Sequence, residues 1–205
     1  VINWLVVFFG VQRGIERANK IFIPALFVLT AILVFWTMTL PGAAEGLSRY
    51  LTPDFSKLAQ PKAWIAAYAQ MFFSLSVGFG IMVAYASYLP RKADLRARAV
   101  ITCVADTLYA IFAGLAVFST LGYMAHQTGT PFEDLVSKGI GLAFVVYPQA
   151  ISLLPDFARV FGVLFFVTLI MAGITSSLSI LEAFTSAVVD KFHYPRRVVV
   201  TILAI

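Results

Sequence analysis

Charged residues are scarce in this chain of 205 residues. Aspartate, glutamate, lysine and arginine make up only 12% of it, whereas 60% of its residues are hydrophobic. A typical soluble domain has about 45–50% apolar and about 25% charged residues. Folding alone cannot remove this much apolar surface from water, so the composition excludes an ordinary soluble domain.

Cysteine and histidine are also scarce. Cys103 is the only cysteine, so no disulfide can form within the chain, and the two histidines have no second ligand at the spacing of a transition-metal site. No serine lies in a nucleophile-elbow sequence. The sequence therefore predicts that the protein is not an enzyme.

Long apolar runs with almost no charged residues make up much of the chain. Four runs, each near or above the ~20 residues that a helix needs to cross a bilayer, cover residues 21–40, 63–89, 99–125 and 160–181. They are continuously apolar rather than alternating, which favours helices over barrel strands. We predict an all-α polytopic membrane protein with spans at 1–10, 14–40, 63–89, 95–124, 157–190 and 196–205, and with outer loops at 41–62 and 125–156.

The basic residues behind the net charge of +5 are distributed along the chain as the predicted topology requires. Ten of the 15 lysine and arginine residues lie in three connectors: Arg13, Arg17 and Lys20; Arg91, Lys92, Arg96 and Arg98; and Lys191, Arg196 and Arg197. These connectors alternate with connectors that hold fewer basic residues, as the positive-inside rule requires. We expect the basic connectors to be cytoplasmic, the lipid bilayer to be a partner, and nucleic acid not to be one.

The middle of the span 63–89 combines glycine and serine. The segment Gln70–Gly80 contains Ser74, Ser76 and Gly78, which lower helix propensity where the membrane is most apolar. An unwound turn there is tolerated only beside protein or a polar cavity, so it would mark a binding site. Close packing of helices through small residues is the alternative.

A second polar segment, Ala172–Ser177, lies in the last long span. The carbonyl of Ala172 and the hydroxyls of Thr175 and Ser176 fall on one helix face. Neutral oxygens in this arrangement suit a monovalent cation. Hydroxyls that bond back to their own helix are the alternative.

Two of the acids within predicted spans lie away from the span ends. Asp106 is well inside its span, where a charge is costly and is a functional candidate, although a structural ion pair or a protonated acid would explain it too. Glu182 lies nearer the cytoplasmic end of its helix and can reach the interface or a basic loop residue.

Several ordered motifs resemble the neurotransmitter:sodium symporter family. The segment Gln70–Gly80, followed by Tyr85–Tyr88, resembles the sixth helix of that family. Other matching motifs follow the order of the family: Gly14–Arg17, Leu40–Ala43, Leu121–Met124, Phe144–Pro148 and Ala172–Ser177.

The resemblance implies a fold that the residues alone do not. It implies a partial LeuT-type inverted-repeat transporter core, running from the end of helix 4 to the start of helix 9. Helix 6 would be discontinuous, a helical hairpin would lie outside between helices 7 and 8, and helices 1–3 and 10 onward would be missing from this chain.

The resemblance also implies binding residues. The substrate would contact Phe73, Ser74, Ser76, Phe79, Ser176 and Ile180, with Phe73 as an aromatic lid. The first sodium ion (Na+) would use Ser74 and Asp106, and the second would use Ala172, Thr175 and Ser176. The remaining ligands would come from the missing helices 1 and 3.

Two further roles follow from the resemblance. Family members commonly have Asn at the position of Asp106, and chloride-independent members have an acid one turn later, at the position of Ala110. We therefore expect Asp106, near Gln70, to supply the charge that chloride supplies elsewhere.

Gly14 and Pro24 match a spacing that, in the family, lets the inner end of helix 5 unwind. An ordinary proline-tolerant helix is the alternative.

The function implied is sodium-coupled symport of a neutral, hydrophobic or aromatic amino acid across the cytoplasmic membrane by alternating access, without chloride. The alternatives are a sodium-independent amino-acid transporter of the same fold and a membrane fragment that does not transport.

Overall fold

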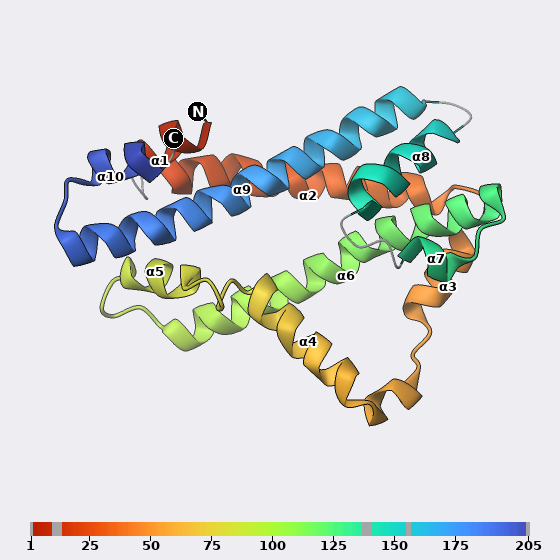
Figure 1. Ribbon diagram of the computed structural model, residues 1–205, viewed down its shortest axis with the longest axis horizontal. Coiled ribbons are helices and arrows are strands. Elements are labelled where there is room, and N and C mark those ends of the chain that lie inside the picture. The colour runs from red at the N-terminus through yellow and green to blue at the C-terminus, as the bar shows by residue number, and fades with distance from the viewer. Residues whose placement is uncertain (1, 10–13, 137–140, 155–156, 204–205) are drawn as a thin grey trace. The chain divides into compact units, whose positions relative to one another are not determined.

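The computed structural model describes residues 2–9, 14–136, 141–154 and 157–203 (Figure 1). All regular elements among these residues are helical. In chain order they are α1 (Ile2–Phe8), α2 (Glu16–Met38), α3 (Ala43–Leu51), the 3-10 helix η2 (Phe55–Ala59), α4 (Pro61–Ser74), α5 (Ile81–Ser87), α6 (Leu95–Thr128), α7 (Phe132–Val136), the π-helix η3 (Leu142–Val146), α8 (Tyr147–Ser152), α9 (Ala158–Phe192) and α10 (Arg196–Leu203). The predicted all-α fold is confirmed.

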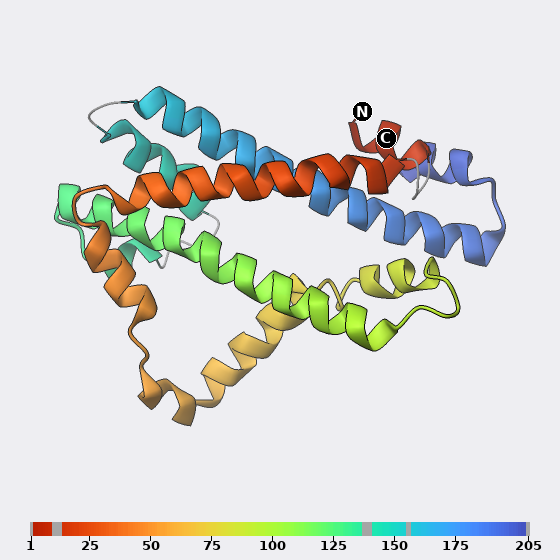
Figure 2. The same cartoon turned by 180° about the vertical axis from the view of Figure 1, so that it is seen from behind.

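Three helices are long and apolar enough to cross a membrane. These are α2, α6 and α9, and each falls within a few residues of a predicted span. The predicted span 63–89 is instead divided between α4 and α5, which are separate helices joined by an irregular segment (Figure 2). Neither half alone reaches the ~20 residues of a crossing helix.

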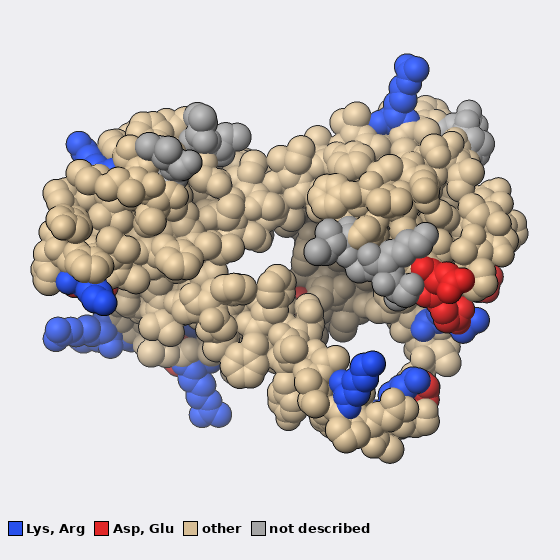
Figure 3. Space-filling model, in the orientation of Figure 1, with Lys and Arg blue, Asp and Glu red and all other residues tan. Residues whose placement is uncertain are grey.

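The long helices keep large apolar side chains on their surfaces. Phe35 of α2 is 70% exposed, Ile101 of α6 is 67% exposed and Val163 of α9 is 63% exposed. In the face shown in Figure 3, most of the surface is uncharged and the charged side chains are few. Apolar surface of this extent requires lipid or further protein to cover it.

The contacts divide the chain into two compact units. Unit 1 contains Val1–Ala25, Phe55–Thr107 and Ile170–Ile205, and unit 2 contains Leu26–Asp54 and Leu108–Leu169. The core of unit 1 is formed by Val7, Ile15, Leu178 and Val200, which join α1, the turn before α2, α9 and α10.

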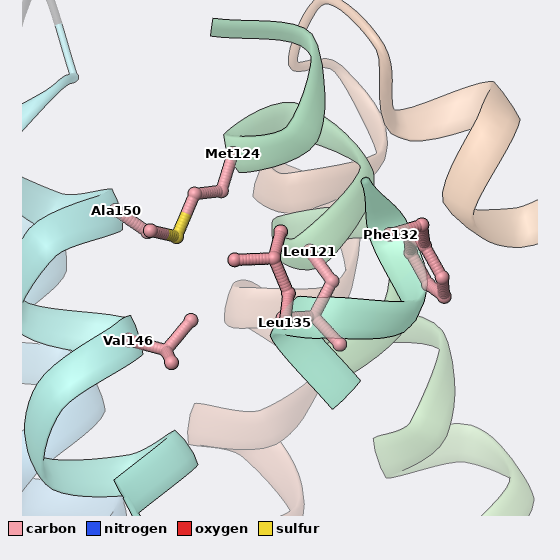
Figure 4. Packing of buried hydrophobic residues seen from close by; sticks show 6 residues of the cluster. All are labelled: Leu121, Met124, Phe132, Leu135, Val146 and Ala150. Atoms are coloured by element: carbon pink, nitrogen blue, oxygen red, sulfur yellow. The ribbon is translucent and has the colours of Figure 1, made fainter. Parts of the chain in front are cut away.

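Unit 2 is organised around the end of α6. Six buried side chains converge there (Figure 4), from α6, α7, η3 and α8: Leu121, Met124, Phe132, Leu135, Val146 and Ala150. The tyrosine hydroxyl of Tyr123 also donates a hydrogen bond of 2.6 Å to the carbonyl of Leu153. The short helices after α6 are therefore packed onto it.

The segment 41–62, predicted to be an outer loop, contains two short helices, α3 and η2. A Cβ atom at Gly46 would overlap the carbonyl of Phe118, so α3 approaches α6 backbone to backbone. Turn residues such as Pro41 and Gly42 favour a loop locally, but docking onto α6 stabilises the helix that follows them.

Candidate functional site

A break in the helical backbone is the first element of the site. α4 ends at Ser74, α5 begins at Ile81, and the residues between them form turns. The amides of Val77 and Gly78 both donate to the carbonyl of Phe72, at 3.2 and 3.3 Å, instead of continuing an α-helix. The break lies within the segment that the sequence analysis identified by its glycines and serines.

Positive backbone angles make the break possible. Gly80 has a φ of 70°, which glycine adopts at no steric cost. Ser76 has a φ of 55°, which is uncommon for a residue with a Cβ atom and costs on the order of 1–3 kcal/mol. Such strain concentrates at functional sites, and Ser76 lines the cavity described next.

A cavity of about 490 Å³ lies in unit 1, between the α4–α5 break, α9 and the first turns of α2. Its wall includes all six residues predicted to contact a substrate: Phe73, Ser74, Ser76, Phe79, Ser176 and Ile180. Gln70 and Thr175 line it as well. The structure thus brings together segments that are about 100 residues apart in the sequence.

The aromatic rings of Phe73 and Phe79 meet across the break. Their centroids are 5.9 Å apart and their planes are inclined by 72°, an edge-to-face arrangement that stabilises aromatic pairs. Both rings remain more than half exposed. They form an apolar part of the cavity wall with surface left for a ligand.

Ser74 and Asp106 are directly bonded. The hydroxyl of Ser74, on α4, donates to both carboxylate oxygens of Asp106, on α6, at 2.9 and 2.8 Å. A hydroxyl has one proton and two lone pairs, so this donation leaves its lone pairs available to an ion. The two side chains predicted for one sodium site are therefore neighbours, and the Asp106 carboxylate contacts the Ser74 hydroxyl directly.

The segment predicted for a second sodium site lies within the continuous helix α9. The hydroxyl of Thr175 donates to the carbonyl of Ala172 at 2.9 Å, as in the back-bonded alternative. This bond uses the proton of Thr175 but leaves its lone pairs, and Thr175 and Ser176 both line the cavity. The back-bonded hydroxyl and a cation ligand are therefore compatible roles for Thr175.

Two tyrosines that the sequence analysis did not assign attach α5 to α9. Tyr85 donates to Ser179 at 2.9 Å, and Tyr88 donates to Glu182 at 2.7 Å. Both partners are spaced three residues apart on their own helices, so each pair lies on one face. This matched spacing is visible in the sequence, but it has meaning only once α5 and α9 are known to be neighbours.

Glu182 reaches a basic residue, which was one of the two predicted possibilities. It is fully buried and accepts hydrogen bonds from Arg196 on both carboxylate oxygens, one of them at 2.8 Å. Arg196 also donates to the carbonyl of Val7 at 3.3 Å. This buried ion pair joins α9, α10 and α1 within unit 1.

The two predicted gating residues lie on either side of the first turns of α2. Gly14 is buried, and a Cβ atom there would overlap the carbonyl of Val6. Pro24 lies inside α2 and cannot donate to the carbonyl of Lys20. Between them, Asn19 and Ile23 line the cavity, although the sequence analysis assigned neither.

Comparisons with known proteins point to one family. The profile of the sodium:neurotransmitter symporter family matches residues 1–205. An uncharacterized sodium-dependent transporter of Methanocaldococcus jannaschii is 51% identical over 94% of this chain and 39% of its own length. The creatine transporter of Torpedo marmorata is 36% identical over 98% of this chain and 34% of its own length.

A solved structure has a similar fold. The crystal structure of MhsT in complex with L-phenylalanine matches with a TM-score of 0.81 and 35% identity, over 98% of this chain and 44% of that one. The chain thus spans less than half of the length of these relatives.

Proposed function

This chain belongs to the sodium:neurotransmitter symporter family, and we propose that the full-length protein containing it couples the uptake of a neutral amino acid to that of sodium. The sodium gradient drives uptake, and the site opens alternately to the two sides of the membrane. We further propose that this membrane is the cytoplasmic membrane. The remaining helices of the site would come from outside this chain.

The cavity beside the α4–α5 break is the observation that carries the proposal. The proposed substrate contacts are Phe73, Ser74, Ser76, Phe79, Ser176 and Ile180, and their common position around one cavity supports them. Freed backbone groups at a break are tolerated in a membrane only beside protein or a polar cavity. A substrate site gives that cavity a function.

A hydrophobic or aromatic amino acid is the proposed substrate class. Phe73, Phe79 and Ile180 provide an apolar wall, and the described residues that line the cavity include no charged side chain. MhsT, whose structure is similar, holds L-phenylalanine. A sodium ion at the first site would neutralise the substrate carboxylate, so the pocket needs no basic residue.

Two sodium sites are proposed. Ser74 and Asp106 would hold the first ion, and the hydrogen bonds between them support this pairing. The Ala172 carbonyl, Thr175 and Ser176 would hold the second. We propose that Asp106, whose partner Ser74 lies one turn after Gln70 on α4, also supplies the negative charge that makes chloride unnecessary.

Uptake by the full-length protein in proteoliposomes tests the function. We expect an inward sodium gradient to stimulate the uptake of one or more of a panel of radiolabelled amino acids, with phenylalanine and leucine among the best. Exchange of amino acids that ignores sodium would instead indicate a sodium-independent transporter of this fold. Absence of both uptake and exchange would indicate a protein that does not transport.

Replacement of Ser74 by alanine is expected to weaken sodium binding. The hydroxyl is a proposed ligand of the first ion, so its loss should raise the sodium concentration for half-maximal uptake by about tenfold. Sodium titration of uptake measures the effect. Ser87→Ala is the matched control, because the Ser87 hydroxyl donates to the Ala84 carbonyl of its own helix and does not line the cavity.

Replacement of Pro24 by alanine is expected to slow turnover roughly fivefold, because the new amide can donate to the Lys20 carbonyl and stabilise the first turns of α2. The maximal uptake rate at saturating sodium and substrate is the measurement. Pro61→Ala is the control, since Pro61 occupies a first-turn position of α4 where no hydrogen bond is lost. An unchanged rate in Pro24→Ala would count against gating by this turn.

A further inference from the structure

Three consecutive hydroxyls of α9 have different surroundings. Thr175 and Ser176 line the cavity proposed to hold the substrate. Ser177, which has no assigned role, instead lines a second cavity of unit 1, together with Asn3 of α1. Successive residues of a helix are turned by about 100° around its axis, so Ser177 points nearly opposite to Thr175. The turn of α9 that carries the proposed ligands therefore faces the substrate cavity on one side and α1 on the other.

A hydrogen bond from α1 holds Ser177. The side-chain amide of Asn3 donates to the Ser177 hydroxyl at 2.8 Å, although the two residues are 174 positions apart in the sequence. Ser177 donates its own proton to the Ile174 carbonyl at 2.9 Å, so it can only accept from Asn3. The contact between α1 and this turn of α9 therefore depends on the N–H groups of Asn3.

The helix α1 is itself held in place by α10. The indole of Trp4 donates to the Thr201 hydroxyl at 3.1 Å, and the guanidinium of Arg196 donates to the Val7 carbonyl at 3.3 Å. Val7 is also fully buried in the core of unit 1. Because these contacts do not involve Asn3, loss of the Asn3 bond would release the turn of α9 while α1 stays attached to α10.

Packing does not fix the rotation of α9 at the start of this turn. A Cβ atom at Gly173 would meet no atom of the described residues within 4 Å. A hydroxyl about 5 Å from the helix axis moves by roughly 1 Å when the helix rotates by about 10°. Binding groups need to be held within about 0.5 Å of their working positions. A small rotation would therefore misplace Ser176 relative to a substrate.

We propose that Asn3 is a positioning residue for the substrate site and that it acts through Ser177. The bond between them sets the rotation of α9, and this rotation sets the direction in which Ser176 meets the amino acid. This inference rests on the proposed function, in which Ser176 contacts the substrate. Asn3 itself contacts neither the substrate nor sodium.

Uptake kinetics of the full-length protein in proteoliposomes test this role. Asn3→Leu keeps the approximate size of the side chain but removes its N–H donors. At saturating sodium, we expect this variant to raise the KM for radiolabelled phenylalanine or leucine about fivefold, with a change of less than about twofold in the maximal rate. Ser177→Ala should raise the KM by a similar factor, because it removes the acceptor of the same bond.

The double variant separates positioning through Ser177 from an independent effect of Asn3. If Asn3 acts through Ser177, Asn3→Leu should raise the KM no further in a protein that already contains Ser177→Ala. The same increase of about fivefold in both backgrounds would overturn the inference. An unchanged KM in the single variant Asn3→Leu would overturn it as well.

Trp4→Phe is the matched control on α1. It removes the hydrogen bond to Thr201 but keeps an aromatic ring next to Asn3. We expect it to lower the apparent melting temperature and to leave the KM unchanged. An equal increase of the KM in Trp4→Phe and Asn3→Leu would show that general loosening of α1 is the cause, which contradicts a specific role for Asn3.

Failure of this inference differs from failure of the proposed function. Native protein that shows no sodium-stimulated uptake would overturn the proposed function and the role of Asn3 with it. Sodium-stimulated uptake with the same KM in the native protein and Asn3→Leu would overturn the positioning role alone.

Discussion

Replacement of Asp106 by alanine is expected to abolish sodium-stimulated uptake at ordinary sodium concentrations. The substitution removes the carboxylate that accepts both hydrogen bonds from Ser74 and the negative charge proposed to balance the first sodium ion. Hydrogen bonds to charged groups contribute about 1.5–3 kcal/mol, which corresponds to a loss of sodium affinity of roughly 10- to 150-fold. Sodium titration of amino-acid binding to the full-length protein measures this loss.

Replacement of Asp106 by asparagine separates charge from shape. The amide oxygen can still accept a hydrogen bond from Ser74, but the negative charge is gone. We expect this variant to transport with chloride present and to lose most of its uptake when chloride is replaced by gluconate, whereas native uptake should be equal in both media.

Asp94→Asn is the control for loss of an acid. Asp94 is exposed, and its carboxylate accepts a hydrogen bond of 3.0 Å from the Ala97 amide at the start of the same helix. Its asparagine variant should behave as the native protein does in both media. Strict dependence of native uptake on chloride would refute the role proposed for Asp106.

Glu182→Leu is the substitution with the largest expected effect on stability. It would leave the guanidinium of Arg196 without its carboxylate partner, and removal of one member of a buried ion pair costs about 3–5 kcal/mol. The Arg196 side chain is 28% exposed, so partial hydration places the expected loss near the lower end of this range, at about 3 kcal/mol. The apparent melting temperature of the full-length protein in detergent reports the change.

A second substitution tests whether the loss comes from the unpaired charge. Glu182→Leu combined with Arg196→Met replaces both charges by apolar groups, and the double variant should recover most of the lost stability. Glu16→Ala is the control, because Glu16 pairs with Lys20 on the exposed surface of α2 and such exposed pairs contribute little to stability. A double variant as unstable as Glu182→Leu alone would show that packing, not charge, causes the loss.

The long helices could be predicted from the sequence because their signal is local. Each of α2, α6 and α9 coincides with a run of apolar residues, and hydropathy depends only on which residues are present. The α4–α5 break was also accessible, since the weak helix propensity of Ser76, Gly78 and Gly80 is a property of the segment itself.

The helix α3 could not be predicted in this way. Its nine residues follow a proline and glycine that favour a turn, and a helix of this length is only marginally stable alone. Its stability comes from contact with α6 at Gly46 and Gly122, where added Cβ atoms would meet backbone.

The position of His126 also differs from the prediction, which placed it in the connector 125–156. It lies in the last turn of α6, because that helix continues beyond its apolar run.

Most polar residues of the site could be recognised from the sequence, but their hydrogen-bond partners could not. Ser74, Asp106, Thr175 and Ser176 stand out because polar groups are costly inside an apolar span, and the family resemblance connected them. Asn19 gave no such signal, because it lies near the end of its span among charged residues, where polar side chains are ordinary. Only the structure places it in the wall of the cavity.

The sequence by itself determined that this chain is a multi-span helical protein of a symporter family, because composition, periodicity and ordered motifs are read along the chain. The tertiary structure alone decided which polar groups meet: Ser74 with Asp106, 32 residues apart, and Tyr88 with Glu182, 94 residues apart. Hydrogen bonds depend on the distance and direction between atoms, which follow from how helices pack rather than from the order of residues.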